Sequence, residues 1–538
     1  MRKTIINFLI FVLFNSATMN GQNIIWEHSE ASSYDEVSRS VINISNGEFL
    51  VGGKATSNTA PINNHHGLQG NNDFWLYKLD STGAMIWNKC YGGTQDEEIY
   101  SVIQTLDNGY CAVGLTYSQD FDVTGLHPTS PWAANSDIWV IKTDSVGNLI
   151  WQKCIGGTGT EVGYYVEQTS DSGIIVIGET DSNDGDVHGL HGTPGLASDI
   201  FLARLDLTGN LLWTKCYGGS FYELGLVCKQ TSDGGFIIGS DINSYDGDVS
   251  CNHGGSTMSG DIWVAKLTTN GQIVWSRCYG GTASEQINQI LLNPDGGFFI
   301  SGSASSNDGD VSGQNGVDDF WLIKCDSLGN IEWQHCYGGS GADNLSMAKI
   351  TPDGGVVMTG FTSSFDGICS DHRLGSGYFD YLVVKVDSGG NFQWSKCLGG
   401  GEDDYAYGLC SSPSGKIIVA GYTKSNDYDV SQYFGGKDSW VVALSDFNSG
   451  IPFLKNSLSE CLAQLNHNRV NIQFNSLANE DLSISLHDLL GREIFYHRIN
   501  CIAGKNKFEF PVNSINKGIY ILKIVGKNGS NSLKLFAE

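Results

Sequence analysis

Carboxylates recur at one position of a repeat in this chain and are the first candidates for chemistry. Asp35 holds that position in the first unit. In later units the carboxylate stands four residues after the second glycine of a Gly-Gly pair, as Glu97, Glu161, Glu223, Glu285, Asp343 and Asp404. A ring of carboxylates at a channel mouth could bind cations or a cationic group of a ligand. Alternatively, each carboxylate accepts hydrogen bonds from backbone N–H groups of a neighbouring turn and ties one repeat to the next.

A loop motif with two aspartates also recurs and could bind a metal. It reads Asp-Gly-Asp in three units, which contain the pairs Asp184 and Asp186, Asp246 and Asp248, and Asp308 and Asp310. A glycine between two carboxylates lets both converge, with backbone carbonyls, on a hard cation, which makes calcium a candidate cofactor. Asp-Gly-Asp is also ordinary turn chemistry, in which Asp accepts local backbone hydrogen bonds, and this alternative stays open.

A histidine stands five residues beyond the second Asp of this loop in three units, as His127, His191 and His253. Because a catalytic base is usually a unique residue, this repetition favours ligand binding or a structural role. Aromatic residues of the same loops, such as Trp132, Tyr245 and Tyr433, could stack on sugar rings or simply fill the loops. No Gly-x-Ser-x-Gly elbow, His-Glu-x-x-His pair or phosphate loop occurs in the sequence, so we assign no catalytic residue.

All these residues belong to a repeat of about 60 residues, a length typical of the blades of repeat proteins. Its marker, Gly-Asn-apolar-apolar-Trp-x-Lys-Cys-x-Gly-Gly, recurs in full or degenerate form around Trp26, Trp87, Trp151, Trp213, Trp275, Trp333 and Trp394. The second unit contains four β-branched or aromatic runs, at 99–105, 109–117, 137–144 and 148–154, bounded by Gly, Asn and Asp. Four antiparallel strands in each of seven units predict an all-β fold, a seven-bladed β-propeller over residues 22–450.

The two ends of the repeat region are complementary. It begins with a Trp strand alone, at 23–29, and ends on Asp438-Ser439-Trp440, which lacks one. Pairing the two would complete the seventh blade and leave no open edge. The recurring Leu-Asp-x-x-Thr-Gly-x-x-x-Trp pattern resembles quinoprotein-like propeller repeats. The resemblance implies the architecture, with the Trp strand outermost, but the quinone and metal ligands of those dehydrogenases have no match here.

The N-terminal segment and the charge indicate where the protein works. Residues 1–21 read as a secretory signal peptide, because Arg2 and Lys3 precede an apolar run at 5–14 that is too short for a membrane-spanning helix. The chain has 31 Lys and Arg against 58 Asp and Glu, a formal net charge of −27, which argues against nucleic acid as a partner. No later stretch is apolar enough to span a bilayer, so we expect an exported mature protein without a transmembrane segment.

The C-terminal segment, residues 451–538, has a different composition. Its alternating strand-like runs predict a small immunoglobulin-like β-sandwich. His487-Asp488-Leu489-Leu490-Gly491-Arg492, then Gly518-Ile519-Tyr520, then Leu533-Lys534-Leu535-Phe536 resemble the type A C-terminal sorting domain of type IX secretion cargo from Bacteroidetes. The resemblance implies that the type IX machinery is a partner of residues 451–538 and that the mature protein is secreted or surface-attached. Such domains commonly end on a basic residue, whereas Glu538 stands here.

The 14 cysteines of an exported chain invite disulfides. Six occupy one repeat position, as Cys90, Cys154, Cys216, Cys278, Cys336 and Cys397. Equivalent positions of neighbouring blades are too far apart for a disulfide, so we expect these six not to pair with one another and to fill space between blades. Cys461 and Cys501 of the tail could pair.

These features favour a non-enzymatic binding module for a glycan or protein ligand, exported by type IX secretion. One alternative is a polysaccharide lyase or hydrolase working at the channel mouth, and another is a passive structural surface protein. An enzyme needs a group of residues that breaks the symmetry of the repeat, and none is evident in the sequence.

Overall fold

The computed structural model describes residues 23–445 and 458–537, apart from short gaps at 31–33, 45–46, 58–61, 63, 69, 128–134, 254–259, 373–377, 413–414, 467–468, 477–479, 489–492, 503, 512–517 and 527–528. The predicted signal peptide, Trp132 and the predicted domain boundary at 450 lie outside these residues. The strands form two compact units, one within 21–447 and the other within 448–538. Each is described by itself.

The strands of the larger unit fall into four sets by their place in the repeat. The first strands are β2 (Glu36–Asn43), β6 (Glu97–Gln104), β10 (Glu161–Gln168), β14 (Glu223–Gln230), β18 (Glu285–Leu292), β22 (Asp343–Ile350) and β26 (Asp404–Ser411). The second strands are β3 (Phe49–Ala55), β7 (Tyr110–Thr116), β11 (Ile174–Thr180), β15 (Phe236–Ile242), β19 (Phe298–Ala304), β23 (Val356–Thr362) and β27 (Ile417–Thr423). The third strands are β4 (Asp73–Leu79), β8 (Asp137–Thr143), β12 (Asp199–Leu205), β16 (Asp261–Leu267), β20 (Asp319–Cys325), β24 (Asp380–Val386) and β28 (Asp438–Leu444). The fourth strands are β1 (Ile24–Glu30), β5 (Met85–Tyr91), β9 (Leu149–Ile155), β13 (Leu211–Tyr217), β17 (Ile273–Tyr279), β21 (Ile331–Tyr337) and β25 (Phe392–Leu398).

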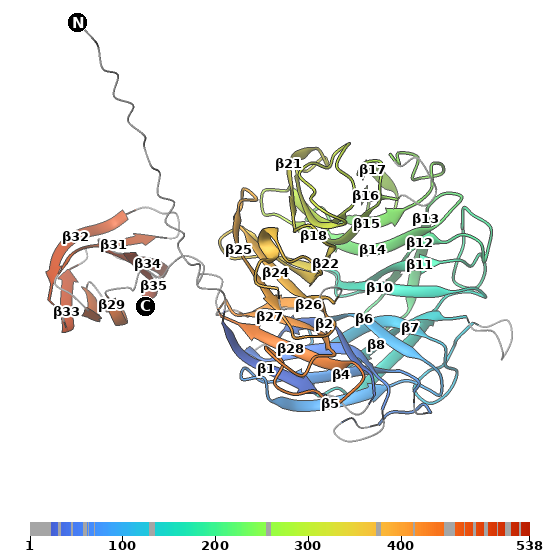
Figure 1. Ribbon diagram of the computed structural model, residues 1–538, viewed down its shortest axis with the longest axis horizontal. Coiled ribbons are helices and arrows are strands. Elements are labelled where there is room, and N and C mark those ends of the chain that lie inside the picture. The colour runs from blue at the N-terminus through green and yellow to red at the C-terminus, as the bar shows by residue number, and fades with distance from the viewer. Residues whose placement is uncertain are drawn as a thin grey trace, which may run out of the picture. The chain divides into compact units, whose positions relative to one another are not determined.

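Within the described part of this unit the strands form seven four-stranded antiparallel sheets. Blades 1 to 6 run in chain order from β2–β5 to β22–β25, and blade 7 contains β26, β27, β28 and β1. The first strand of every blade contacts the first strand of the next, and β26 contacts β2. The sheets therefore close a ring around a centre lined by first strands (Figure 1), which confirms the β-propeller.

Closure of the ring follows the prediction from the two chain ends. β1 pairs antiparallel with β28, so that Trp26 lies opposite Ala443. The pairing satisfies the outer edge of β28 with a strand from the other end of the repeat region. Separating β1 from β28 would expose the unpaired edges of both strands.

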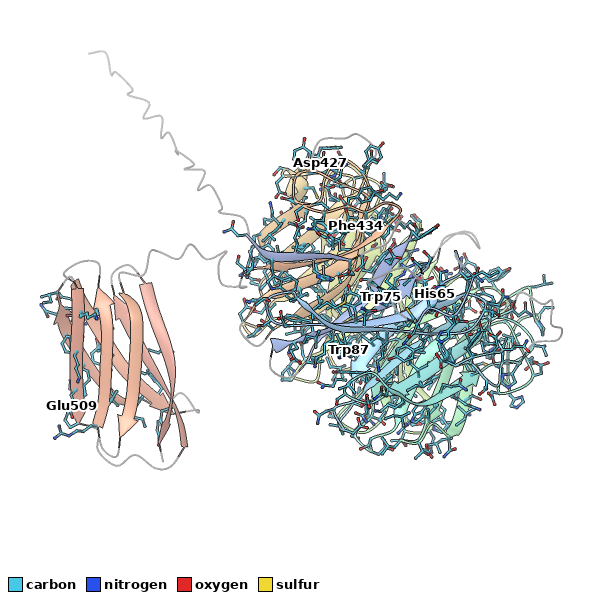
Figure 2. The ribbon with its side chains drawn as sticks, turned by 90° about the horizontal axis from the view of Figure 1, so that it is seen from below. His65, Trp75, Trp87, Asp427, Phe434 and Glu509 are labelled. Atoms are coloured by element: carbon cyan, nitrogen blue, oxygen red, sulfur yellow. A yellow bond between two sulfur atoms is a disulfide. The ribbon has the colours of Figure 1, made fainter. Side chains whose placement is uncertain are left out.

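Aromatic residues explain why neighbouring blades pack. Trp75 of β4 is fully buried within the sheet stack, whereas Trp87 of β5 lies toward the next blade, 6.1 Å from the Tyr110 ring between centroids (Figure 2). Tyr91 donates a hydrogen bond of 2.5 Å to the Gly147 carbonyl of blade 2. The same tyrosine hydrogen bond joins blades 3, 4 and 5 to their successors, whereas Ile155 and Leu398 hold this place in blades 2 and 6.

Every first strand contains a bulge that decides which side chains face the centre. In β6 the register against β7 shifts between Ile99 and Ser101, which leaves Tyr100 as the extra residue. The same shift occurs in the first strand of all seven blades. A bulge adds twist and re-aims the extra side chain.

The smaller unit contains seven described strands in two sheets. They are β29 (Leu458–Asn466), β30 (Arg469–Ser476), β31 (Glu480–Asp488), β32 (Glu493–Cys501), β33 (Gly504–Pro511), β34 (Gly518–Gly526) and β35 (Gly529–Ala537). The sheet orders are β29-β30-β33 and β32-β31-β34-β35, and both sheets contribute to one apolar core. The predicted sandwich is confirmed, while its immunoglobulin-like character stays a prediction. Across the described residues of the whole chain, no helix has the length and apolar character needed to cross a bilayer.

Candidate functional site

The repeated carboxylates begin the first strands and are buried. Glu97 accepts a hydrogen bond of 2.9 Å from the Gly93 backbone N–H of the link between blades and one of 2.7 Å from the Thr116 hydroxyl. Burial raises its pKa to about 7, against the hydrogen bonds from Ser118 and Thr116. All members of the set are at most 1% exposed. This geometry agrees with the second alternative, in which each carboxylate accepts hydrogen bonds from the turn that leads into its blade.

One assignment from the sequence is wrong by one residue. Glu36 pairs with Ala55 as Glu97 pairs with Thr116, so Glu36, not Asp35, is the carboxylate of blade 1. Asp35 corresponds to the residue before it. The link into blade 1 follows β1 and lacks the Gly-Gly pair, so no spacing marked the position.

The first aspartate of each Asp-Gly-Asp loop accepts hydrogen bonds from nearby groups of the chain. Asp184 accepts bonds of 2.7 and 2.8 Å from the backbone N–H and hydroxyl of Thr158. Asp186 turns to the preceding blade, where its carboxylate lies 3.9 Å from His127 Nε2. Ser220 donates the same two hydrogen bonds to Asp246, and Thr282 donates them to Asp308. The described residues contain no group of three or more His, Cys, Asp or Glu side chains arranged to hold a metal. Calcium binding stays a prediction.

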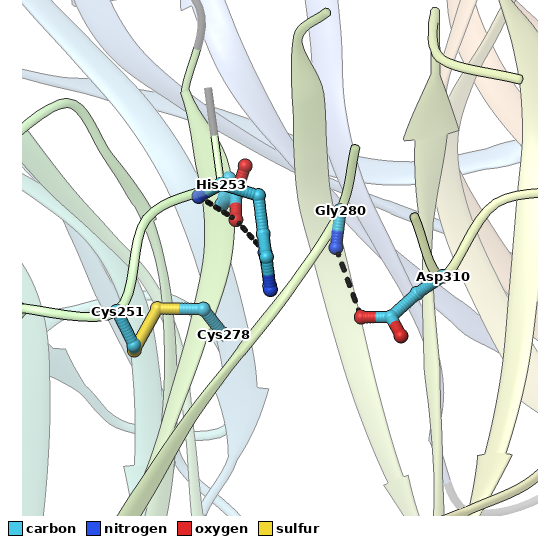
Figure 3. Close-up of a disulfide and its surroundings, with 6 residues drawn as sticks. Cys251, His253, Cys278, Gly280 and Asp310 are labelled. Carbon is cyan, nitrogen blue, oxygen red and sulfur yellow. Dashed lines mark hydrogen bonds and ion pairs between the residues drawn. A yellow bond between two sulfur atoms is a disulfide. The ribbon is translucent and has the colours of Figure 1, made fainter. Parts of the chain in front are cut away.

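The repeated histidines join neighbouring blades. His191 Nδ1 lies 2.7 Å from Asp199 of its own blade, and its Nε2 lies 3.5 Å from Asp248 of the next. His127 and His253 make the same Nδ1 contact with the aspartate that begins their third strand, as Figure 3 shows for His253. His66 completes the set in blade 1, with Asp73 at 3.1 Å. In His66, His127 and His191 an aspartate of the next blade also lies 3.5–3.9 Å from Nε2. A ligand-binding role for the histidines stays a prediction.

His66 was missed because the loop of the first unit lacks the Asp-Gly-Asp motif that marks the others. Its only signal was a His-His-Gly sequence shortly before Asp73. Such a short match carries little weight without the fold.

The centre of the propeller encloses a cavity of about 330 Å³ that breaks the symmetry of the repeat. The extra residue of each bulge lines it, and we call these residues the bulge ring: Arg39, Tyr100, Tyr164, Leu226, Asn288, Ser346 and Tyr407. The bulge is the same in every blade, but the side chain it presents is different. The sequence signal was present, because each bulge-ring residue stands three places after a buried carboxylate.

One side of the cavity is charged and aromatic. Arg39 donates from Nε to Glu98 over 2.7 Å, and Lys54 donates to the other Glu98 oxygen over 3.0 Å. The Arg39 guanidinium also lies 4.3 Å from the Tyr407 ring centroid. Despite its burial, Glu98 keeps a pKa below its usual value because these two cations face it. Because Arg39 and Lys54 share the single Glu98 carboxylate, the three groups together carry one net positive charge.

The opposite side of the cavity is lined by amides whose acceptors are unpaired. Asn288 Oδ1 and Gln289 Oε1 are buried and have no hydrogen-bond partner in the structure. Gln289 is only 2% exposed, and its amide nitrogen contacts Met347 Sδ at 3.3 Å. A buried acceptor without a donor is costly, so a donor that reached either oxygen would stabilise the folded chain.

Five aromatic residues of blades 6 and 7 form one cluster that reaches the cavity wall at Phe361 and Tyr407. The aromatic cluster consists of Phe361, Phe379, Tyr405, Tyr407 and Tyr422, with neighbouring ring centroids 4.5–6.5 Å apart. Tyr405 stacks on Tyr422 with 17° between the ring planes. Aromatic faces of this kind accept the C–H faces of sugars as well as other rings.

Burial raises the pKa of Tyr100, Tyr164 and Tyr407 above the usual value of tyrosine. A tyrosine with a raised pKa is a poor general base near neutral pH. Chemistry of the lyase type, which needs a base beside its substrate, is therefore disfavoured at these positions.

Comparison with known proteins bears mainly on the tail. Residues 466–538 match the family model of the secretion system C-terminal sorting domain. The chain carries a type IX secretion sorting domain. The domain directs export to the cell surface or the extracellular space, and the type IX machinery is the partner that it addresses. The localisation expected from the sequence is thereby confirmed.

Matches to the propeller are weaker. An alignment of 194 residues is 29% identical to the regulatory protein FlaEY of Caulobacter vibrioides and covers 33% of this chain and 20% of that protein. The chain thus spans about a fifth of the length of that curated relative.

Solved structures give a similar picture. Puromycin hydrolase is 11% identical with a TM-score of 0.42, over 82% of this chain and 59% of that one. The Neurospora crassa Pan2 WD40 domain is 9% identical with a TM-score of 0.40, over 76% and 88%. At these scores neither supports an argument about function.

Proposed function

We propose that the protein is an exported, non-enzymatic binding module that holds a neutral glycan in the central cavity of its propeller. The observation that carries the proposal is the pair of unpaired amide oxygens, on Asn288 and Gln289, in a cavity whose wall also contains aromatic rings. Sugar hydroxyls donate hydrogen bonds, and sugar rings present C–H faces to aromatic side chains. The cavity supports both contacts.

Charge supports a neutral rather than an anionic glycan. Residues 22–451 contain 19 Lys and Arg against 51 Asp and Glu, so an anionic polymer would meet a repulsive surface. Inside the cavity, Arg39 is already paired with Glu98. Arg39 is the one Lys or Arg among the described residues that line the cavity, and Glu98 engages its Nε and one terminal nitrogen.

The repeat itself supplies variants that test the proposal. Leu226 and Val227 of blade 4 occupy the places of Asn288 and Gln289, and Met347 holds the second place in blade 6. Asn288→Leu with Gln289→Met therefore installs residues that the same fold already accepts. Loss of two hydrogen bonds should weaken glycan binding about tenfold or more.

The direct measurement is retention of the exported chain on a panel of neutral and acidic polysaccharides, with and without calcium. An assay for released reducing ends is run on the same samples. We expect retention by a neutral polysaccharide, no released ends, and loss of retention in the double variant. Gln393→Leu is the matched control, since other blades have Ile86 or Leu212 at that outer position. Released ends, or retention by acidic polymers alone, would overturn the proposal.

A further inference from the structure

Two loops place an aromatic residue where the repeat requires glycine. In the loop between second and third strands, the residue after the first Asp is left-handed, with φ between 60° and 64° at Gly185, Gly247, Gly309 and Gly367. Phe121 of blade 2 and Tyr428 of blade 7 hold this position with φ of 54° and 52°. L-residues avoid this region because Cβ approaches the backbone, and for bulky residues it is rare.

The surroundings make a side chain at this position still less favourable. A Cβ added at Gly247 would lie 2.2 Å from the Gly218 carbonyl oxygen, and one at Gly309 would lie 2.4 Å from the Gly280 oxygen. The backbone bond from the second Asp to that linking glycine is 2.8–2.9 Å in the three Asp-Gly-Asp loops. It is 3.1 Å for Asp122 and 3.2 Å for Asp429, which follow the aromatic residues. The equivalent bond of blade 6, from Ile368 to Gly338, is 3.3 Å although Gly367 precedes it, so the length of this bond does not depend on the aromatic side chains alone.

Burial does not offset this strain. Phe121 is 65% exposed and Tyr428 is 62% exposed. Phe121 makes one ring contact, with His66, at 5.1 Å between centroids. A strained backbone position whose side chain stays largely exposed is most simply explained by a function of that side chain.

The two residues also share a sector with the charged and aromatic half of the cavity. Blades 7 and 2 flank blade 1, and these three blades supply Tyr407, Arg39 and Tyr100 to the bulge ring. We propose that Phe121 and Tyr428 are glycan-stacking residues, which extend the binding site of the cavity onto the loops of blades 2 and 7. This inference rests on the proposed function.

Glycine variants separate a ligand contact from a structural role. Phe121→Gly and Tyr428→Gly restore the residue that the other loops use, so we expect a urea midpoint equal to or above that of the parent. We expect each to weaken retention by the neutral polysaccharide that binds the parent at least threefold. Gly309→Tyr is the reverse variant and should lower the midpoint.

The outcomes distinguish this inference from the function on which it rests. If the parent is retained by no polysaccharide, both fail. If the parent binds and the variant with Asn288→Leu and Gln289→Met loses binding, but both glycine variants bind as the parent does, only this inference fails. A glycine variant with a clearly lowered midpoint would show that the aromatic residue serves the fold.

Two cysteines of blade 6 lie in the same core cluster. Five loops place a buried valine two residues after the left-handed position, as Val123, Val187, Val249, Val311 and Val430. Cys369, in the single-turn 3-10 helix η2 (Gly367–Cys369), replaces it in blade 6. Cys369 and Cys397 of β25 are fully buried in one core cluster, where their thiols are neighbours, and Cys369 Sγ also lies 3.5 Å from Asp343 Oδ1.

Blade 4 shows that the fold accepts such a link. There Cys278, which holds the repeat position of Cys397, forms a disulfide with Cys251 of the loop between the second and third strands (Figure 3). We infer that Cys369 and Cys397 also form a disulfide when the chain is exported. Both thiols lose their protons and one electron each, the S–S bond forms, and a disulfide of an exchange partner in the oxidising compartment is reduced to two thiols.

Peptide mapping of the exported protein tests the second inference. After alkylation under denaturing, non-reducing conditions, we expect a linked peptide pair containing Cys369 and Cys397, lighter by two hydrogens than the reduced pair. Cys154, buried without a disulfide at the same repeat position in blade 2, should be alkylated and is the internal control. Alkylation of both Cys369 and Cys397, or linkage of either to another cysteine, would overturn the inference.

Discussion

Buried carboxylates should make the propeller more stable at pH 6 than at pH 8. Burial raises the pKa of Glu97, Glu161 and Asp319 to about 7 each, well above the values of exposed carboxyl groups. A carboxyl whose pKa is higher in the folded than in the unfolded chain binds protons more tightly when folded. Its contribution is complete below the unfolded pKa and is lost as the pH rises through the folded pKa.

The size of the effect follows from these values. For a carboxyl with a folded pKa of about 7 and an unfolded pKa of about 4, the free energy of unfolding falls by about 1.3 kcal/mol between pH 6 and pH 8. The three groups together give about 4 kcal/mol, against about 5–15 kcal/mol for the free energy of unfolding of a typical domain. Asp241, whose pKa burial raises to about 8, acts in the same direction.

Urea titration followed by tryptophan fluorescence isolates this effect, because all 13 tryptophans precede residue 441 and none lies in the sorting domain. We expect the midpoint to be clearly lower at pH 8 than at pH 6. Asp319→Asn is the matched variant, since an amide oxygen can still accept the 2.9 Å hydrogen bond from the Asn315 N–H. It should be more stable than the parent at pH 8 and lose about a third of the pH dependence. A midpoint that is unchanged or higher at pH 8 would refute this account of the buried carboxylates.

Three further predictions follow from other contacts. Calcium and EDTA should leave the melting temperature unchanged, because hydrogen bonds already engage Asp184, Asp246 and Asp308; a rise of several degrees with calcium would show that the loops bind it. Asp184→Ala should lower the free energy of unfolding by about 0.5–1.5 kcal/mol, measured by urea titration, because the exposed Thr158 N–H and hydroxyl lose their acceptor to water, while Asp184→Asn should cost less. Deletion of residues 466–538 should leave the folded propeller inside the cell, as cell fractionation would show, and export of the truncated chain would contradict the role of the tail.

Strand order and ring closure could be predicted from the sequence because both depend on local signals. Alternating apolar residues and Gly-Asn turns mark each strand, and a repeat that cannot bury its faces alone must stack on its neighbours. The Trp strand at 23–29 and the missing fourth strand after Asp438 predicted the pairing of β1 with β28. The sorting domain was recognised from its own motifs, independently of the propeller.

The cysteines show a mixed outcome. In the structure five of the six at the shared repeat position carry no disulfide, and Cys90 and Cys154 are buried fillers as expected. Cys278 departs from the expectation because Cys251, from a loop of variable sequence, reaches it. The predicted pairing of Cys461 with Cys501 involves a side chain outside the described residues.

The sequence by itself determined the number of repeats, the class of fold and the route of export, since each is written in patterns shorter than one blade. Only the tertiary structure decided which residues meet at the centre. A bulge after Ile99 turns Tyr100 toward the cavity, and a bulge does not show in the alternation of apolar residues. The repeat signal also drew attention to shared residues such as Glu97, whereas the cavity is lined by the residues that differ. Ring closure brings these different side chains of seven blades together in one cavity, and no local sequence pattern predicts which of them become neighbours.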